Sequence, residues 1–219
     1  MRRSARLLGL FALFALLMGG CDSFSLSDYL SSEEEASPDE ITTNELSLTI
    51  QKTTLLPGET IQTVATGGKG PYTLTAVEND ISAATVGNDI GSFSSDQTVF
   101  TAGAAIGKID LTVLDSLGAK DTKTITVIPP APTGLYATAS GTGTIYITLH
   151  WAYSHEALIS SFAWTSTNVN DGSTTSGSIS KNERSTTITG NPNKQYRIIL
   201  ESVSGSYTSA PIETTVSTY

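Results

Sequence analysis

Residues 145–151 read Ile-Tyr-Ile-Thr-Leu-His-Trp, and this stretch sets the class of fold. Every second position is apolar: Ile145, Ile147, Leu149 and Trp151. Successive side chains of a β-strand point to opposite faces, so the stretch predicts a strand with one buried face. His150 falls on the other face, opposite Trp151.

The same alternation recurs from residue 45 to the end of the chain. Residues 61–66, 109–113 and 125–127 carry apolar side chains at alternate positions, and Gly, Pro, Asn and Asp turns separate such runs. Outside the N-terminal leader, no stretch shows the spacing of an amphipathic helix. The sequence therefore predicts an all-β fold built as two tandem β-sandwiches.

A proline-rich segment divides these runs into two domains. Ile128-Pro129-Pro130-Ala131-Pro132 lacks backbone donors at three positions and favours an extended, stiff backbone. We expect a first sandwich over residues 45–128, a linker over 129–132 that holds the domains end to end, and a second sandwich over 133–219. Each stretch is long enough for one hydrophobic core.

The first domain contains the run Gly67-Gly68-Lys69-Gly70-Pro71-Tyr72-Thr73-Leu74. This run resembles a hairpin of bacterial immunoglobulin-like domains. The order of later elements extends the resemblance, through Phe100-Thr101-Ala102-Gly103 to the hairpin at 115–119. The resemblance implies a sandwich of cell-surface and envelope proteins without an enzymatic site.

The second domain opens with residues 131–139, and Trp151 ends its next run of alternating apolar residues. These features resemble the first strand and the core tryptophan of fibronectin type III domains, and the resemblance extends along the whole domain. Pro192, four residues before Tyr196, matches a turn in which the tyrosine hydroxyl bonds back to the backbone. Gly190 departs from the family pattern, which commonly has Leu at this place.

The N-terminus has the parts of a bacterial lipoprotein signal. Three arginines precede an apolar core at 7–17, and Gly19-Gly20 stands directly before Cys21, the only cysteine of the chain. The core is shorter than the roughly 20 residues that span a bilayer. The run at 17–21 resembles a lipobox, with Met18 where Leu is usual, so residues 1–20 are expected to be cleaved and Cys21 acylated.

Lipidation at Cys21 would tether the protein to a membrane of the bacterial cell envelope, outside the cytoplasm. Whether this is the inner or the outer membrane stays open. Several acyl chains bind firmly, since each buried methylene contributes about 0.8 kcal/mol. No thiol would then remain for a disulfide, so both domains must be stable through their cores.

An acidic, serine-rich segment follows the anchor, over residues 21–44. Residues 21–45 hold eight Asp and Glu and no Lys or Arg, and loss of the three leader arginines changes the formal charge from −9 to −12. Such a composition favours a disordered tether. An acidic docking segment for a basic partner is the other interpretation. Nucleic acid binding is not expected, because no basic stripe is present.

Catalytic motifs are not found in the sequence. It has no Gly-x-Ser-x-Gly, Walker-type or His-Glu-x-x-His motif, and its two histidines are His150 and His155. His155 precedes Glu156, but two ligands alone are a weak metal signal. We expect a non-enzymatic protein without metal or cofactor.

Calcium is an open question in the first domain. Asn79-Asp80 and Asn88-Asp89 recur nine residues apart, and loop carboxylates and amides are calcium ligands. The same residue types form turns by bonding their own backbone. The spacing of a calcium-binding loop is missing, so turn formation is favoured.

Tyr153 and His155 form the candidate binding surface, since both lie in the loop that follows residues 145–151. Exposed loop aromatics on sandwiches serve recognition. The expected function is non-catalytic binding or adhesion, with an unidentified protein or glycan partner. The alternative is a structural spacer or accessory subunit of an envelope or secretion assembly.

Overall fold

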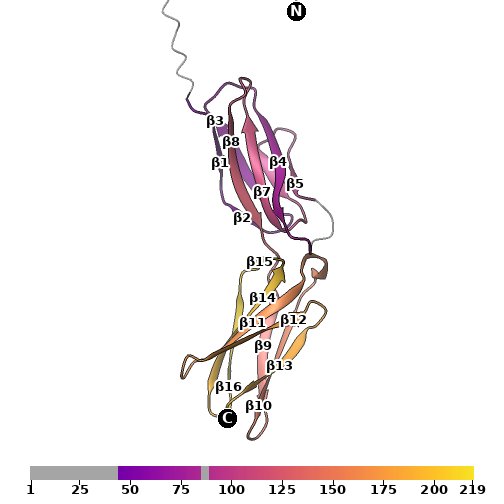
Figure 1. Ribbon diagram of the computed structural model, residues 1–219, viewed down its shortest axis with the longest axis vertical. Helices are drawn as coiled ribbons and strands as arrows, with labels where there is room; N and C mark the ends of the chain where they lie inside the picture. Colours follow the sequence, from indigo (N-terminus) through magenta and orange to yellow (C-terminus); the bar gives the residue numbers. More distant parts are fainter. Residues whose placement is uncertain (1–43, 85–88) are drawn as a thin grey trace, which may run out of the picture. The chain divides into compact units, whose positions relative to one another are not determined.

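The computed structural model describes residues 44–84 and 89–219, and these residues form β-strands joined by turns (Figure 1). One short 3₁₀ turn, η1 (Glu156–Leu158), is the only helix in the described ranges. The all-β prediction is confirmed. The leader, Cys21 and the acidic segment up to residue 43 lie outside the described residues, as does Asn88.

The first group of strands lies before the proline-rich segment. Its members are β1 (Ser47–Ile50), β2 (Thr54–Leu55), β3 (Thr60–Thr66), β4 (Thr73–Ile81), β5 (Gly91–Phe93), β6 (Val99–Ala102), β7 (Gly107–Leu114) and β8 (Lys120–Val127). They pair in two sheets, in the orders β1-β3-β6-β5 and β2-β8-β7-β4. All neighbours are antiparallel except β2 and β8, which are parallel.

The second group follows residues 128–132, which lie outside any strand. Its members are β9 (Thr133–Ser140), β10 (Ile145–Ala152), β11 (Ser161–Asn168), β12 (Thr174–Ser180), β13 (Ser185–Gly190), β14 (Gln195–Ser204), β15 (Tyr207–Thr208) and β16 (Ile212–Ser217). One sheet has the order β13-β10-β9. In the other, β12 pairs with β11 and β11 with β14, and β14 also pairs with β15 and β16.

Each group encloses a hydrophobic core between its two sheets. In the first core, β7 buries Ile109, Leu111 and Val113, while Phe100 from β6 is fully buried opposite them. In the second core, β10 buries all four apolar residues of the 145–151 stretch. The apolar residues of the period-2 pattern therefore face the cores, as expected for sheets with one buried face.

Asp115 joins two turns of the first group. Its carboxylate accepts hydrogen bonds from the backbone N–H groups of Lys69 at 2.9 Å, Leu117 at 2.9 Å and Ala119 at 2.8 Å. Gly68 has a φ of 58°, and a Cβ there would lie 2.7 Å from the Asp115 carboxylate. A glycine is thus required at position 68, where a left-handed turn approaches a buried carboxylate.

Contacts also join the two groups, whose described residues fall within one compact unit. The Tyr207 side chain packs against the first core, and its hydroxyl donates to the Asp80 carboxylate at 2.6 Å. Burial, with the Asp80 hydrogen bond and charge, raises the pKa of Tyr207 to about 12. The hydroxyls of Ser82 and Ser204 lie 3.0 Å apart, and both residues are buried.

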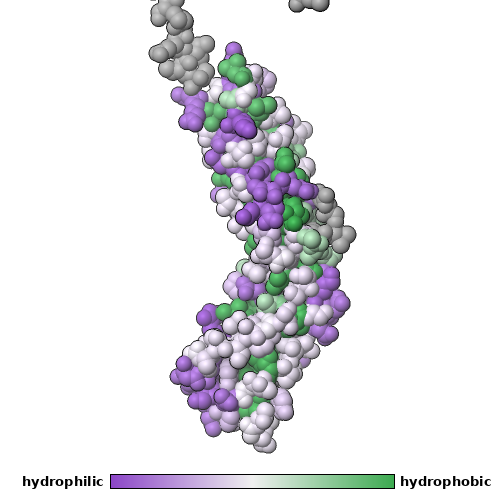
Figure 2. Space-filling view, viewed as in Figure 1, coloured by the Kyte–Doolittle hydropathy of each residue, from purple (hydrophilic) through white to green (hydrophobic). Residues whose placement is uncertain are grey.

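The exposed apolar residues are spread over several strands and turns. On the face shown in Figure 2, they form small groups among polar residues rather than one broad patch. Apart from the C-terminal Tyr219, the most exposed large hydrophobic residues are Leu117, Val77, Tyr136 and Val169. Within the described ranges, no helix is both long and apolar enough to cross a membrane.

We predict that Asp115→Asn destabilises the protein at neutral pH and flattens its acid sensitivity. The Lys69 hydrogen bond, followed by those of Ala119 and Leu117, holds the pKa of Asp115 below its ordinary value. A lowered pKa adds stability above the unfolded-state value of about 3.9, and this stability is lost as pH falls through the folded-state pKa. Thermal unfolding followed by circular dichroism from neutral to strongly acidic pH measures it.

Glu78→Gln is the matched control, because Glu78 is an exposed carboxylate on β4. This variant is expected to unfold with the wild-type midpoint at every pH. A deficit of Asp115→Asn that stays the same at acidic pH would show that the stabilisation does not depend on the charge.

Candidate functional site

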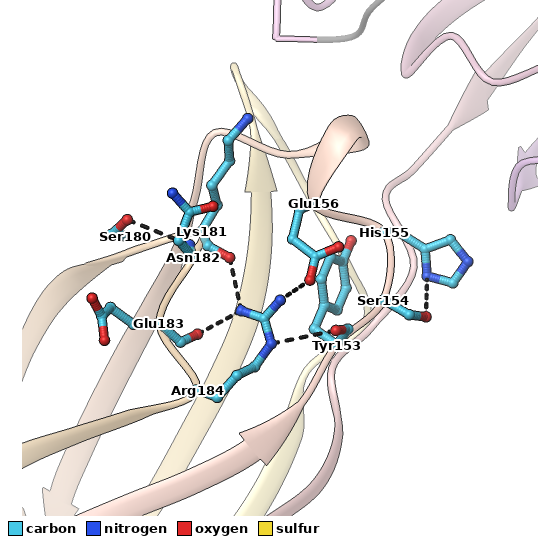
Figure 3. Close-up of polar contacts among 9 residues, drawn as sticks. All are labelled: Tyr153, Ser154, His155, Glu156, Ser180, Lys181, Asn182, Glu183 and Arg184. Carbon is cyan, nitrogen blue, oxygen red and sulfur yellow. Dashed lines mark hydrogen bonds and ion pairs between the residues drawn. The ribbon is translucent and has the colours of Figure 1, made fainter.

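The candidate surface lies where two connections of the second group meet (Figure 3). The segment 153–160 joins β10 to β11, and the turn 181–184 joins β12 to β13. Tyr153 and His155 both come from the first segment, as the sequence predicts. Arg184 comes from the second and reaches toward them.

Arg184 holds the two segments together. Its guanidinium donates to the carbonyls of Tyr153 at 3.3 Å, Lys181 at 2.8 Å and Glu183 at 2.6 Å, and forms an ion pair with Glu156. It also lies 6.0 Å from the centre of the Tyr153 ring. A planar guanidinium has several donors and can bond to groups of both segments at once. These contacts of Arg184 fix the segment that carries Tyr153 and His155.

Tyr153 is half-buried, so only part of this loop aromatic is open to solvent. Its ring packs against the second core and meets Phe162 edge-on, with the centroids 5.2 Å apart. Its hydroxyl is buried without a hydrogen-bond partner among the described residues. The nearby Ser202 hydroxyl donates to the Pro130 carbonyl instead, at 2.6 Å. Burial raises the pKa of Tyr153, and the nearby Ser202 and Arg184 offset this only in part.

His155 remains on the surface. It is exposed, its Nδ1 lies 3.2 Å from the Ser154 hydroxyl, and its ring meets the edge of Tyr153 at 5.8 Å. Glu156, the other half of the His-Glu pair, is engaged by Arg184. The candidate binding surface thus reduces to His155 and the outer edge of Tyr153. The described ranges hold no group of three or more His, Cys, Asp or Glu able to bind a metal ion.

His150 lies on the outer face of β10, as the alternation predicts. Its ring stacks on that of Tyr136 from β9, with the centroids 4.9 Å apart. The ring of His155 instead meets Tyr153. The two histidines of the chain therefore belong to separate environments.

The residues considered for calcium make other contacts in the described ranges. The Asn79 amide donates to the Asp110 carboxylate at 2.9 Å, and Asp80 accepts from Tyr207. Asp89 accepts from the backbone N–H of Gly91 at 3.1 Å, which is the Asx turn favoured by the sequence.

Trp151, Pro192 and Tyr196 occupy the places that the second resemblance implies. Trp151 is 5% exposed and meets Phe162 edge-on, at 5.4 Å between centroids. Pro192 stands in the turn between β13 and β14. The Tyr196 hydroxyl accepts from the backbone N–H of Asn191 at 2.8 Å, so the hydroxyl bonds back across this turn.

Gly190 has a steric reason to differ from the family pattern. A Cβ at this position would lie 2.9 Å from Ile147 and 3.0 Å from the Tyr196 ring. The departure from Leu therefore does not weaken the turn. Gly190 leaves space for the Tyr196 ring, and the Tyr196 hydroxyl can then reach the backbone N–H of Asn191.

Neither a protein-family model nor a curated protein matches the sequence. Among solved structures, a two-domain fibronectin type III segment of chicken tenascin matches at 16% identity, with a TM-score of 0.54, over 78% of this chain and 98% of that one. The chain shares the fibronectin type III fold. Since either group alone makes up less than 78% of the chain, the likeness spans both.

Single fibronectin type III domains are also similar. The domain of human collagen alpha-1(XX) matches 40% of this chain at 14% identity, with a TM-score of 0.36. That of human contactin 1 matches 41% at 20% identity, with a TM-score of 0.33. Of these three matches, it is the tenascin segment that carries the argument for the shared fold.

Arg184 is the residue of this region that sequence reasoning missed. It stands in a polar turn, Lys181-Asn182-Glu183-Arg184, whose composition is typical of any solvated hairpin. Its partner Glu156 lies 28 residues earlier. Only the crossing of β12 to β13 between the two sheets brings these segments together.

We predict opposite effects of removing two tyrosine hydroxyls. Tyr153→Phe removes a buried, unpaired hydroxyl and is expected to be neutral or to stabilise by up to about 1 kcal/mol. Tyr196→Phe leaves the Asn191 N–H without its acceptor and is expected to destabilise by about 1–3 kcal/mol. Urea unfolding measures both, and each variant is the control of the other. A loss in Tyr153→Phe as large as that in Tyr196→Phe would contradict the assignment.

Proposed function

We propose that the protein is a lipid-anchored, non-catalytic binding or adhesion protein of the bacterial cell envelope. Acyl chains on Cys21 hold it to a membrane, and the acidic segment 21–44 separates that anchor from two β-sandwich domains. The domains carry the binding surface and present it away from the membrane.

The observation that carries this proposal is the tandem fibronectin type III fold. Domains of this fold are commonly binding or spacer modules without catalysis, and their loops vary while the sheets stay fixed. The loops at the ends of the described sandwiches are therefore the places to look for a ligand.

The chemistry of the described residues agrees with a binding role. Glu156 is neutralised by Arg184, and the Nδ1 of His155 faces a serine hydroxyl rather than a carboxylate. A binding surface needs exposed groups held in fixed places rather than a nucleophile beside a base. The Arg184 contacts supply that fixation.

The anchor is supported by the sequence around Cys21. The leader offers a positive end, an apolar core and small residues before a single cysteine. The absence of any other cysteine means that acylation would not compete with a disulfide.

We predict that the wild-type protein incorporates palmitate and fractionates with membranes. Cys21→Ser removes the acceptor thiol, so the label is lost and the uncleaved leader remains attached. Radiolabelling, mass determination and membrane fractionation test this. Ser25→Ala is the control, because it changes a nearby residue of the acidic segment and leaves the thiol. A wild-type protein without label would refute the anchor.

A spacer or accessory subunit is the second candidate, favoured by the Tyr207–Asp80 and Ser82–Ser204 contacts that join the two groups. To separate the roles, the leader is replaced by an ordinary secretory signal and Cys21 by Ser. We expect this soluble form to retain an envelope ligand in affinity capture. Recovery of a stoichiometric membrane complex, only with the lipidated protein, would support the spacer role instead.

A further inference from the structure

A cavity of about 450 Å³ opens between the two sheets of the second group. Thr189 and Gly190 come from β13 and Thr144 directly precedes β10, whereas Ser166 and Tyr196 come from the sheet of β11 and β14. Its volume lies within the range of about 300–1,000 Å³ found for small-molecule sites. It is separate from the Tyr153–Arg184 region, with which it shares no residue.

The lining of this cavity is polar and uncharged. Its nine residues include hydroxyl, amide and aromatic side chains, and none is Lys, Arg, Asp, Glu or His. Hydroxyls both donate and accept hydrogen bonds, whereas a charged ligand would find no opposite charge here. The chemistry therefore favours a neutral ligand rich in hydroxyl groups.

Ser166 is the most buried hydroxyl-bearing residue of this lining. It is 3% exposed and follows Phe162 and Trp164 on the core-facing side of β11, where an apolar residue would complete the core. Its hydroxyl is not among the buried side-chain atoms that lack a partner in the described ranges, which are Trp151 Nε1 and Tyr153 Oη. It lines the cavity instead, where a hydroxyl can bond to water or to a ligand.

Thr175 extends this polar wall. It stands directly opposite Ser166 in the pairing of β11 with β12, and side chains of such pairs lie on the same face of the sheet. Both line the cavity. The sheet thus presents two hydroxyls side by side from rigid strands, a spacing suited to adjacent hydroxyls of one ligand ring.

Neighbouring contacts hold the remaining wall in place. Tyr196 is fixed by its hydrogen bond from Asn191, and Gly190 leaves space beside the ring. On the rim, the Ser173 hydroxyl donates to the Asp171 carboxylate at 2.6 Å. Preorganised polar groups around one aromatic side chain match the two surfaces of a sugar, which are hydroxyls and C–H groups.

We propose that this cavity binds one ring of a neutral saccharide. Ser166 and Thr175 bond to ring hydroxyls, the Asn191 amide closes the rim, and Tyr196 contacts the apolar side of the ring. The inference rests on the proposed binding function and names the ligand class for it. Both a free saccharide and a sugar unit of an envelope polymer have this chemistry.

The test uses the full-length, lipidated protein in deuterated detergent with three neutral disaccharides: maltose, cellobiose and N,N′-diacetylchitobiose. Saturation-transfer NMR is expected to show transfer to the ring protons of at least one of them. Ser166→Val is expected to weaken this binding at least tenfold, because it replaces the buried hydroxyl by methyl groups. Thr165→Val is the matched control, since Thr165 lies on the other face of β11.

Thermal unfolding establishes that each variant is folded, and Thr175→Val provides a second test at the exposed end of the wall. Transfer that is absent for all three sugars, or unchanged in both Ser166→Val and Thr175→Val, overturns the proposal. Glucuronic acid is expected to bind more weakly than the neutral sugars, and equal or tighter binding would also overturn it.

Starch, cellulose and chitin in pull-down assays distinguish the two sources of the sugar. Retention on a polymer together with binding of its disaccharide supports a polymer-borne unit, and binding of the disaccharide alone supports a free saccharide. Loss of all sugar binding while the soluble form still captures an envelope ligand refutes the cavity and leaves the proposed function standing. Loss of both refutes the function as well.

Discussion

Burial of apolar side chains between paired sheets carries the stability of both sandwiches. The described residues contain no cysteine, so no disulfide adds to the stability that the hydrophobic cores provide. The strands that supply the cores must therefore keep a set of apolar residues on the inner face, since a shift in register by one position would turn that set to solvent. This requirement explains why β7 and β10 share the same strict pattern of burial.

Polar groups complete the fold where the cores end. Asp115 accepts three backbone N–H groups and joins two hairpin turns, Tyr196 ties the turn before β14, and Arg184 ties two loops. Each satisfies groups that the sheets leave unpaired. At the same end of the sandwich, Tyr196 and Asn168 have hydrogen-bond partners within the protein, whereas the Ser166 side chain lines the cavity.

The proposed function joins an anchor at one end of the chain to recognition at the end of a sandwich. A lipid on Cys21 would restrict the protein to a surface, where local concentration raises weak affinities. A shallow cavity for one saccharide ring fits such a setting, since single rings bind weakly. Fixed loops and rigid strands reduce the ordering cost of that binding.

The sequence by itself determined the all-β class and the faces of β3, β7, β8 and β10, because a period of two is a local property of the chain. It missed β2 and β5, which have two and three residues and too few positions for a pattern. It also missed β12 and β13, which are rich in Ser and Thr and bury only one apolar residue each. Only the tertiary structure decided that Tyr153 packs inward, that Arg184 reaches Glu156, and that Ser166 lines a cavity. Each depends on strands from two different sheets, whose approach is set by packing between them and leaves no mark in the neighbouring residues.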